Sequence, residues 1–322
     1  MPRIHCYAES WPLKSAFVIS RGTRTEAVVV VVEIEDHGLV GCGECTPYAR
    51  YGESVESVLA AIERVAPMVE AGVNCQELQA LMPAGAARNA VDSALRDLQV
   101  RRDSRAGAGV HTADRTGDSL PTVQTLVIDT PAAMGDMALA VVKRGVRVLK
   151  LKLDQAQVLE RVQAVRRAVP DAELVIDANE SWSAEGLPSL CEQLAELGVA
   201  MLEQPLPVDA DDILESFDHP LPICADESCH TRADLPRLMG RYDMVNIKLD
   251  KTGGLTEALA LADSAEGQGF ELMLGCMLCT SRAVRAAWPL GSRARFVDLD
   301  GPTWLAKDVA PLRFEGGRVF WT

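Results

Sequence analysis

The sequence lacks long apolar runs and an excess of basic residues. No stretch of about 18 uncharged apolar residues, the length that crosses a bilayer, occurs in it. Its start, MPRIHCYAESWPL, has no apolar segment of the kind found in export signals. The 32 lysines and arginines against 46 acids give a net charge of −14, which disfavours nucleic acid and anionic membranes as partners. We therefore expect a cytoplasmic enzyme with a small-molecule substrate; a homo-oligomer stays open.

Cysteine usage does not indicate a disulfide scaffold. Nine cysteines in 322 residues are few for such a fold, and the odd number leaves at least one unpaired. Two C-x-x-C pairs, Cys42/Cys45 and Cys276/Cys279, could form a zinc site only if all four thiolates converged. Because each pair borders an apolar strand-like segment, we favour small buried thiols at strand ends over zinc.

The chain divides into an α+β unit and a series of alternating strands and helices. Ala27–Ile34 and Leu39–Glu44 flank the turn Asp36-His37-Gly38 and predict a hairpin, and two amphipathic segments, Glu53–Val69 and Ala86–Val100, predict helices. Asp103–Ser119, rich in small polar residues, is interpreted as a linker. Residues 1–115 are therefore predicted to form an α+β capping domain.

Eight short strands follow, and a helix is predicted after each of the first seven. The eighth leads into DLDGP, where Gly301 and Pro302 oppose a helix. The sequence has no G-x-G-x-x-G turn after an early strand, which weakens the alternative of an open doubly wound sheet. We predict an α/β fold, a modified TIM barrel of the (β/α)7β type over residues 116–303, with residues 304–322 returning to the cap. A hairpin is expected from Pro311 onward.

The expected strands and their helices have the following limits. The strands are Thr122–Ile128, Val148–Leu153, Leu174–Asp177, Met201–Glu203, Ile223–Ala225, Met244–Lys248, Glu271–Leu274 and Phe296–Asp298. The helices are Pro131–Arg144, Gln155–Ala168, Ala184–Leu197, Asp209–Ser216, Arg232–Leu238, Leu255–Gly267 and Ser281–Trp288.

Three acids end successive apolar runs at near-equal intervals. Asp177, Glu203 and Asp226 are separated by 203 − 177 = 26 and 226 − 203 = 23 residues, about one β/α unit each. In a barrel the C-terminal strand ends converge on one mouth, so these carboxylates would meet there. Carboxylate oxygens without His or Cys suit a hard cation such as Mg²⁺.

Lysines flank these acids. Lys150 and Lys152 are two apart on one strand and therefore share a face, while Leu149, Leu151 and Leu153 would face the helices. Two neighbouring ammonium groups lower each other's pKa, which favours a general base. Lys248 follows the sixth strand, opposite the second in an eight-stranded ring. A base on each side of one carbon would invert it through an enediolate that a metal stabilises, which favours a racemase or epimerase.

The motifs LKLKLD, IDANESW, LEQPL, ADES and NIKLDKTGGL, in this order, resemble the muconate-lactonizing branch of the enolase superfamily, and GCGECTPYARYGES resembles that family's capping domain. The resemblance covers nearly the whole chain. It implies Mg²⁺ on Asp177, Glu203 and Asp226, and acid/base roles for Lys152 and Lys248 with assistance from Lys150. It also implies that Asn179 and Glu227 orient the metal ligands.

Substrate identity must come from other residues. Asp298 and Asp300 end the eighth strand on one face, and two uncompensated acids would bind an α-ammonium group. This D-x-D resembles the dipeptide epimerases. The expected loop Ser20–Glu26 carries Arg21 and Arg24; we choose Arg24 to pair with a distal carboxylate, and Thr125 and Cys276 are weaker candidates for substrate contact. The expected reaction is epimerisation of L-Ala-D/L-Glu in the turnover of peptidoglycan peptides.

Several alternatives remain. N-acylamino-acid racemase and o-succinylbenzoate synthase share the superfamily, but the D-x-D pair argues against both. A Schiff-base aldolase or a barrel that only binds a ligand would leave the three spaced acids unexplained. Two departures from the family pattern, GCMLCTS at the seventh strand end and Asp250 close to Lys248, bear on substrate preference.

Overall fold

The computed structural model describes residues 1–106, 117–309 and 311–321. Its N-terminal unit is a three-stranded antiparallel sheet of β1 (Arg3–Ile19), β2 (Gly22–Asp36) and β3 (Leu39–Cys45), in the order β1-β2-β3. The second turn is the predicted one, since Asp36 pairs with Leu39 and both His37 and Gly38 have positive φ. Three helices pack on this sheet: α1 (Val55–Glu70), α2 (Cys75–Leu81) and α3 (Ala86–Arg105). The predicted hairpin is confirmed.

The rest of the chain is dominated by eight strands that run in parallel and follow chain order. The strands are β5 (Gln124–Leu126), β6 (Val148–Lys152), β7 (Glu173–Asp177), β8 (Val199–Glu203), β9 (Ile223–Ala225), β10 (Met244–Ile247), β11 (Glu271–Gly275) and β12 (Phe296–Asp298). The amide of Val123, just before β5, donates to the Val297 carbonyl in β12 at 2.8 Å and joins the two ends of the series. The predicted modified barrel with an N-terminal cap is confirmed.

Helical segments separate the strands, and the last strand has no α-helix after it. The segments are α4 (Pro131–Val142), α5 (Val158–Ala168), α6 (Leu187–Glu196), η3 (Asp211–Ser216), η4 (Arg232–Asp234) with α7 (Leu235–Leu238), α8 (Leu249–Thr252) with α9 (Leu255–Gly267), and α10 (Ser281–Ala287) with η5 (Trp288–Leu290). In the part of the chain that the structure describes, β12 is followed by the 3₁₀ turn η6 (Gly301–Trp304) and by no α-helix. The predicted helix at Asp209–Ser216 is also 3₁₀ in the structure and begins at Asp211.

Strand side chains alternate between two cores. Leu149, Leu151 and Leu153 lie in the large core beneath the helices, as predicted. Inside the ring a small apolar cluster includes Val175 and Met201. Because successive strand residues point to opposite faces, Lys150 and Lys152 point into the ring. Apolar side chains therefore fill part of the ring interior, and charged side chains gather at the C-terminal strand ends.

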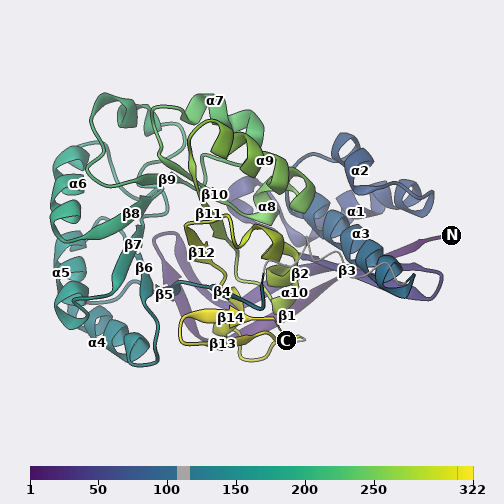
Figure 1. Cartoon of the computed structure of the whole chain (residues 1–322), viewed down its shortest axis with the longest axis horizontal. Helices are drawn as coiled ribbons and strands as arrows, with labels where there is room; N and C mark the ends of the chain where they lie inside the picture. Colours follow the sequence, from purple (N-terminus) through teal and green to yellow (C-terminus); the bar gives the residue numbers. More distant parts are fainter. Residues whose placement is uncertain (107–116, 310, 322) are drawn as a thin grey trace.

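Figure 1 shows the cap helices on one side of the barrel and the purple hairpin of β1 and β2 reaching from the cap across the barrel strands. The expected loop Ser20–Glu26 is wrong in extent, because only Ser20 and Arg21 lie between these strands and Arg24 pairs with Phe17 inside the hairpin. The tail forms the expected hairpin of β13 (Arg313–Glu315) and β14 (Arg318–Phe320). The strand β4 (Ser119–Pro121) pairs with β14 and completes a three-stranded sheet.

The predicted linker Asp103–Ser119 is helical at its start, where α3 continues to Arg105, and ends in β4. Its residues 107–116 lie outside the described part. The domain limits at 115 and 303 stay predictions. The segment after η6 contacts the cap, where the Ala306 amide donates to the Pro12 carbonyl at 2.8 Å, whereas Val319 of the terminal hairpin packs into the barrel core.

Buried polar contacts join the cap to the barrel. Arg88 of α3 donates to the carbonyls of Thr252, at 2.6 Å, and Gly253, at 3.0 Å. Asp250 accepts from the Thr46 amide at 3.0 Å and from Asn89 at 2.9 Å. Burial raises the pKa of Asp250 to about 7. Asp250, which departs from the family pattern, therefore lies in the cap–barrel interface, because cap residues donate hydrogen bonds to its carboxylate.

Gly43 of β3 lies against α3 with no room for a side chain. A Cβ there would be 2.0 Å from the Ala90 carbonyl oxygen. We expect Gly43→Ala to lower the free energy of unfolding by about 1–3 kcal/mol, because α3 must shift from the sheet. Gly267→Ala is the matched control, since nothing lies within 4 Å of its Cβ. Urea unfolding would measure both, and equal midpoints for the two variants would contradict the expectation.

Candidate active site

The predicted acids and lysines meet at the C-terminal ends of the barrel strands. Asp177, Glu203 and Asp226 are at most 1% exposed, on or just after β7, β8 and β9. Lys152 Nζ lies 2.5 Å from Asp177 Oδ2, and Lys248 Nζ lies 2.7 Å from Asp226 Oδ2. Lys152 is the last residue of β6 and Lys248 directly follows β10, and these strands are four positions apart in the sheet. The two lysines thus approach the acids from opposite sides of the ring.

Lys150 has a different environment from the one expected. Its Nζ lies 2.7 Å from Glu203 Oε2, 2.7 Å from Asp298 Oδ2 and 3.1 Å from Asp177 Oδ2. Burial alone would lower the pKa of Lys150, but the attraction of these carboxylates raises it well above its ordinary value. The prediction of a lowered lysine pKa is wrong here, because β7, β8 and β12 bring three carboxylates to Lys150 and their attraction outweighs the effect of burial.

The acids respond to the same charges. Lys152 and Lys150 hold the pKa of Asp177 below its ordinary value in spite of burial. Burial and the neighbouring Asp177 raise the pKa of Glu203 to about 7. Burial acts upward on Asp226 as well, but Lys248 and Lys251 hold its pKa well below its usual range. Proton affinity therefore differs sharply among three acids that lie within one small volume.

The donor chemistry of the three acids fits a divalent cation. All three are buried oxygen donors. No group of three His, Cys, Asp or Glu in the described part of the chain is already arranged around a metal position. Lysine ammonium groups lie against these carboxylates instead, with Lys150 in contact with both Asp177 and Glu203. Three buried carboxylates at one mouth are the oxygen donors that Mg²⁺ prefers in proteins, so the donor set fits this ion.

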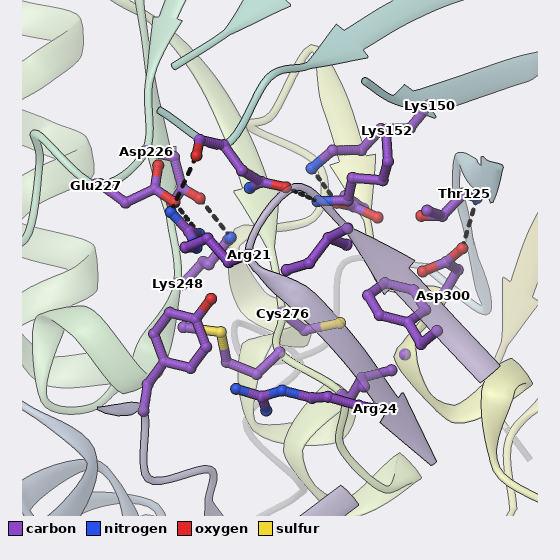
Figure 2. Close-up of a pocket in the computed structure, with 18 of the residues that line it drawn as sticks. Arg21, Arg24, Thr125, Lys150, Lys152, Asp226, Glu227, Lys248, Cys276 and Asp300 are labelled. Atoms are coloured by element: carbon purple, nitrogen blue, oxygen red, sulfur yellow. Dashed lines mark hydrogen bonds and ion pairs between the residues drawn. The ribbon is translucent and has the colours of Figure 1, made fainter. Parts of the chain in front are cut away.

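Asn179 and Glu227 lie beside the acids. The side-chain oxygen of Asn179 accepts a hydrogen bond from Lys152 Nζ at 3.2 Å, and the backbone amide of Asn179 donates to Asp177 Oδ1 at 2.9 Å. Glu227 forms an ion pair with Arg21, as Figure 2 shows. The other oxygen of Glu227 has no hydrogen-bond partner in the described chain.

The D-x-D pair faces the same pocket, but its acids are not both uncompensated. Asp298 pairs with Lys150, which contradicts that premise. Asp300 Oδ2 accepts from the Thr125 amide at 2.7 Å and from Gln124 at 3.2 Å (Figure 2). Burial and the charge of Asp298 raise the pKa of Asp300 to about 7. Sequence spacing placed both acids on one face but could not reveal that Lys150 pairs with Asp298.

The remaining candidates line the pocket. Arg24 lies with its guanidinium 5.1 Å from the centre of the Tyr48 ring, and it has no carboxylate within ion-pairing distance among the described residues. Thr125 is buried, while Cys276 is partly exposed and lies in the GCMLCTS segment beside Gly301. All nine cysteines are free; of the two C-x-x-C pairs only Cys45 and Cys279 are fully buried, so the buried-thiol interpretation holds for half of them.

Sequence reasoning missed three charged residues. Lys251 is buried and donates to Asp226 Oδ1 at 2.7 Å and to the Asn246 carbonyl at 2.8 Å. Arg21, named but not chosen, contacts Glu227 and Glu180. The i, i+3 spacing of Lys248 and Lys251 was an available signal, because both then follow one strand end. No local signal marked Glu180.

Comparisons with known proteins agree with this geometry. The model described as mandelate racemase / muconate lactonizing enzyme, N-terminal domain, matches residues 2–106, and that of an enolase C-terminal domain-like unit matches residues 133–319. The chain is 59% identical over 324 residues to L-Ala-D/L-Glu epimerase of Escherichia coli K12, covering 99% of each.

Two further relatives differ in specificity. An N-acetyl-D-glutamate racemase of a Pseudoalteromonas species is 44% identical over 282 residues, covering 87% of this chain and 88% of its own. A dipeptide epimerase of Methylococcus capsulatus, solved with Mg and the dipeptide L-Arg-D-Lys, superposes with a TM-score of 0.88 at 33% identity and covers 99% of this chain and 96% of its own. In the described residues no helix is long and apolar enough to cross a membrane.

Proposed function

This chain belongs to the mandelate racemase and muconate lactonizing enzyme family, with an enolase-like C-terminal domain, and we propose that it epimerises L-Ala-D/L-Glu with the help of Mg²⁺. It is an isomerase of the racemase and epimerase kind. The observation that carries the proposal is the pair Lys152 and Lys248, each held against a different buried carboxylate from opposite sides of the ring. Such a pair can reach both faces of one α-carbon.

Asp177, Glu203 and Asp226 would hold the Mg²⁺, which supplies a Lewis acid next to the substrate carboxylate. Lys152 removes the α-proton from one face, and Lys248 delivers a proton to the other. Burial opposes the ammonium form of Lys248, but the attraction of Asp226 raises the pKa of Lys248, so Lys248 carries the proton that it must donate. Lys150 places a buried positive charge beside the reacting carboxylate. In the reverse direction the two lysines exchange roles.

Other residues fix the orientation of the groups that react. The Asn179 side chain accepts a hydrogen bond from Lys152 Nζ, and the Asn179 backbone amide donates one to Asp177. Glu227 holds Arg21 at the tip of the cap hairpin. These contacts fix the lysine and the hairpin relative to the strand ends, so that the proton is transferred over a short and constant distance.

The periphery of the pocket supports the choice of substrate. Asp298 and Asp300 would bind the α-ammonium group, and Thr125 and Cys276 would contact the body of the dipeptide. Arg24 would pair with the side-chain carboxylate of the second residue, because it lines the pocket and has no carboxylate partner among the described residues. A cytoplasmic role in the turnover of peptidoglycan peptides follows from this substrate, and we assign no nucleic-acid or membrane partner.

A second candidate is an N-acylamino-acid racemase. Asp298 already has Lys150 as a partner and Asp300 has Thr125, so neither needs a substrate ammonium to be satisfied. The relative of Pseudoalteromonas, named for an N-acetylated amino acid, fits this candidate. o-Succinylbenzoate synthase, the other alternative from the sequence, has no such support.

Free and N-acetylated L-Ala-L-Glu separate the two candidates. We expect the free dipeptide to take up deuterium at the α-carbon of Glu in heavy water, which proton NMR measures. Its kcat/KM should be roughly ten- to a hundredfold above that of the blocked dipeptide. One charge-assisted contact contributes about 1.5–3 kcal/mol, which sets this range. Equal turnover of blocked and free substrates would favour the racemase.

Arg24→Met should lower turnover of Ala-Glu and spare dipeptides with an apolar second residue.

A further inference from the structure

Glu180 occupies a junction of three segments at the mouth of the barrel. It follows β7 by three residues, and its side chain is only 8% exposed. Both Glu180, at φ 64°, and its neighbour Asn179, at φ 45°, adopt left-handed backbone conformations that cost energy for residues other than glycine. The surrounding contacts must offset that cost. Two strained residues in a row directly after a strand that carries Asp177 suggest that the direction of this turn matters to the site.

Each segment at the junction contributes hydrogen bonds to the Glu180 carboxylate. Arg21, from the tip of the β1–β2 hairpin, donates to Oε2 at 3.0 Å. Arg50, from the short helix η1 (Ala49–Tyr51) of the cap, donates to both oxygens at 2.7 Å. The amide of Val208, after β8, donates to Oε1 at 3.2 Å. Glu180 thus ties the hairpin tip, the cap and the barrel together.

The junction leads directly to one lysine. The guanidinium of Arg21 that binds Glu180 also donates to the Asn179 carbonyl at 3.2 Å. The Asn179 side chain in turn accepts from Lys152 Nζ at 3.2 Å. Lys248 is connected to Glu180 less directly: Arg21 also pairs with Glu227, but the hydrogen-bond partner of Lys248 among the described residues is Asp226, the residue before Glu227. A change at Glu180 should therefore reach Lys152 before it reaches Lys248.

The closed pocket is too small for a substrate. Its cavity measures about 70 Å³, whereas sites for small organic ligands are roughly 300–1,000 Å³. Phe17, Ile19, Arg21 and Arg24 of the hairpin form one of its walls. For a dipeptide to fit, residues that line the pocket must move, and a movement of the hairpin wall would break and re-form the contacts of Arg21 with Glu180 and Asn179.

We propose that Glu180 is a positioning residue for Lys152: by capturing Arg21 when the hairpin closes, it fixes Asn179 and thereby the lysine that acts on one face of the substrate. This inference rests on the proposed epimerase reaction and deepens it. It makes closure of the hairpin and readiness of one base a single event, while the opposite base is held by Asp226, which Arg21 does not contact.

The test is the α-proton exchange of each epimer of Ala-Glu in heavy water with Glu180→Gln. The face served by Lys152 is defined by the exchange that Lys152→Ala loses. On that face we expect Glu180→Gln to slow exchange on the order of ten- to a hundredfold, the size of effect that small misplacement of a reacting group produces. Exchange on the Lys248 face should change less than threefold. Glu180→Asp, which keeps the charge, should recover part of the rate.

Two controls make the result decisive. Glu271→Gln removes a glutamate that pairs with Arg295 at 2.6 Å on the exposed start of β11, and it should leave both faces unchanged. If Glu180→Gln does not fold, as judged by circular dichroism, Arg50→Gln removes a more exposed partner of the same carboxylate and should give a smaller loss on the same face. Equal loss on both faces, or no loss on either, overturns the inference. Absence of exchange in the unmodified enzyme overturns the epimerase reaction itself.

Discussion

Lys152→Ala is expected to abolish net epimerisation while the enzyme still exchanges the α-proton of one epimer with solvent. Lys248→Ala should lose epimerisation as well and exchange only the other epimer. The reason is geometric, because the two lysines lie at the ends of strands four apart in the ring, so each is expected to reach one face of the substrate. A positioned general base contributes roughly 10²–10⁴ to a rate, so each variant should lose at least about a hundredfold in epimerisation.

Proton NMR in heavy water measures both effects from either starting epimer. Lys143→Ala, which changes an exposed lysine at the end of α4, serves as the control and should epimerise normally. If each lysine variant still exchanged both epimers at the unmodified rate, the assignment of one base to each face would be wrong. If Lys152→Ala and Lys248→Ala lost exchange of the same epimer, both lysines would have to act on one face.

Removal of divalent metal is expected to abolish activity without unfolding the protein. Chelation should bring turnover to background and Mg²⁺ should restore it, because the substrate carboxylate would lose its Lewis acid. The fold should persist, since Lys150, Lys152 and Lys248 already neutralise the buried carboxylates in the structure. Activity assays and thermal melts with and without chelator would measure the two quantities separately.

Asp177→Asn tests the same site by mutation. It removes a charge at a buried ligand position, so Mg²⁺ affinity measured by calorimetry should fall by at least an order of magnitude, as the loss of a ligand charge implies. Asp218→Asn, at an exposed position, is the matched control. Full activity in enzyme verified to be free of metal would refute the magnesium assignment.

The sequence predicted the arrangement of the barrel because its signals are local. Each acid and each lysine closes an apolar strand, and parallel strands in a ring bring their C-terminal ends together. Period-two alternation assigned Leu149 and Leu151 to the helix side and the lysines to the interior, as the structure has them. These inferences needed only neighbouring residues and the geometry of the fold.

What the sequence could not predict depends on contacts across long distances. The pKa of Lys150 rises because Asp298 and Glu203, 148 and 53 residues away, lie beside it. The sequence predicted a loop over Ser20–Glu26, whereas β1 runs to Ile19 and β2 begins at Gly22, which leaves only Ser20 and Arg21 at a tight tip. Glu180 carries no local signal because its partners, Arg21 and Arg50, come from the cap.

Because the β1–β2 hairpin lines the pocket, the residues that contact the substrate and those that transfer protons come from different parts of the chain. Its strands pair with each other at Phe17 and Arg24, not with the barrel ring, so their side chains can be exchanged without touching the strand ends that carry the lysines. Mutations at strand positions such as Phe17 and Arg24, away from Arg21 at the tip, can therefore alter substrate preference while the lysines and their carboxylate partners are inherited intact. A scaffold built in this way can diversify in specificity by small steps, because no step requires the chemistry to be invented again.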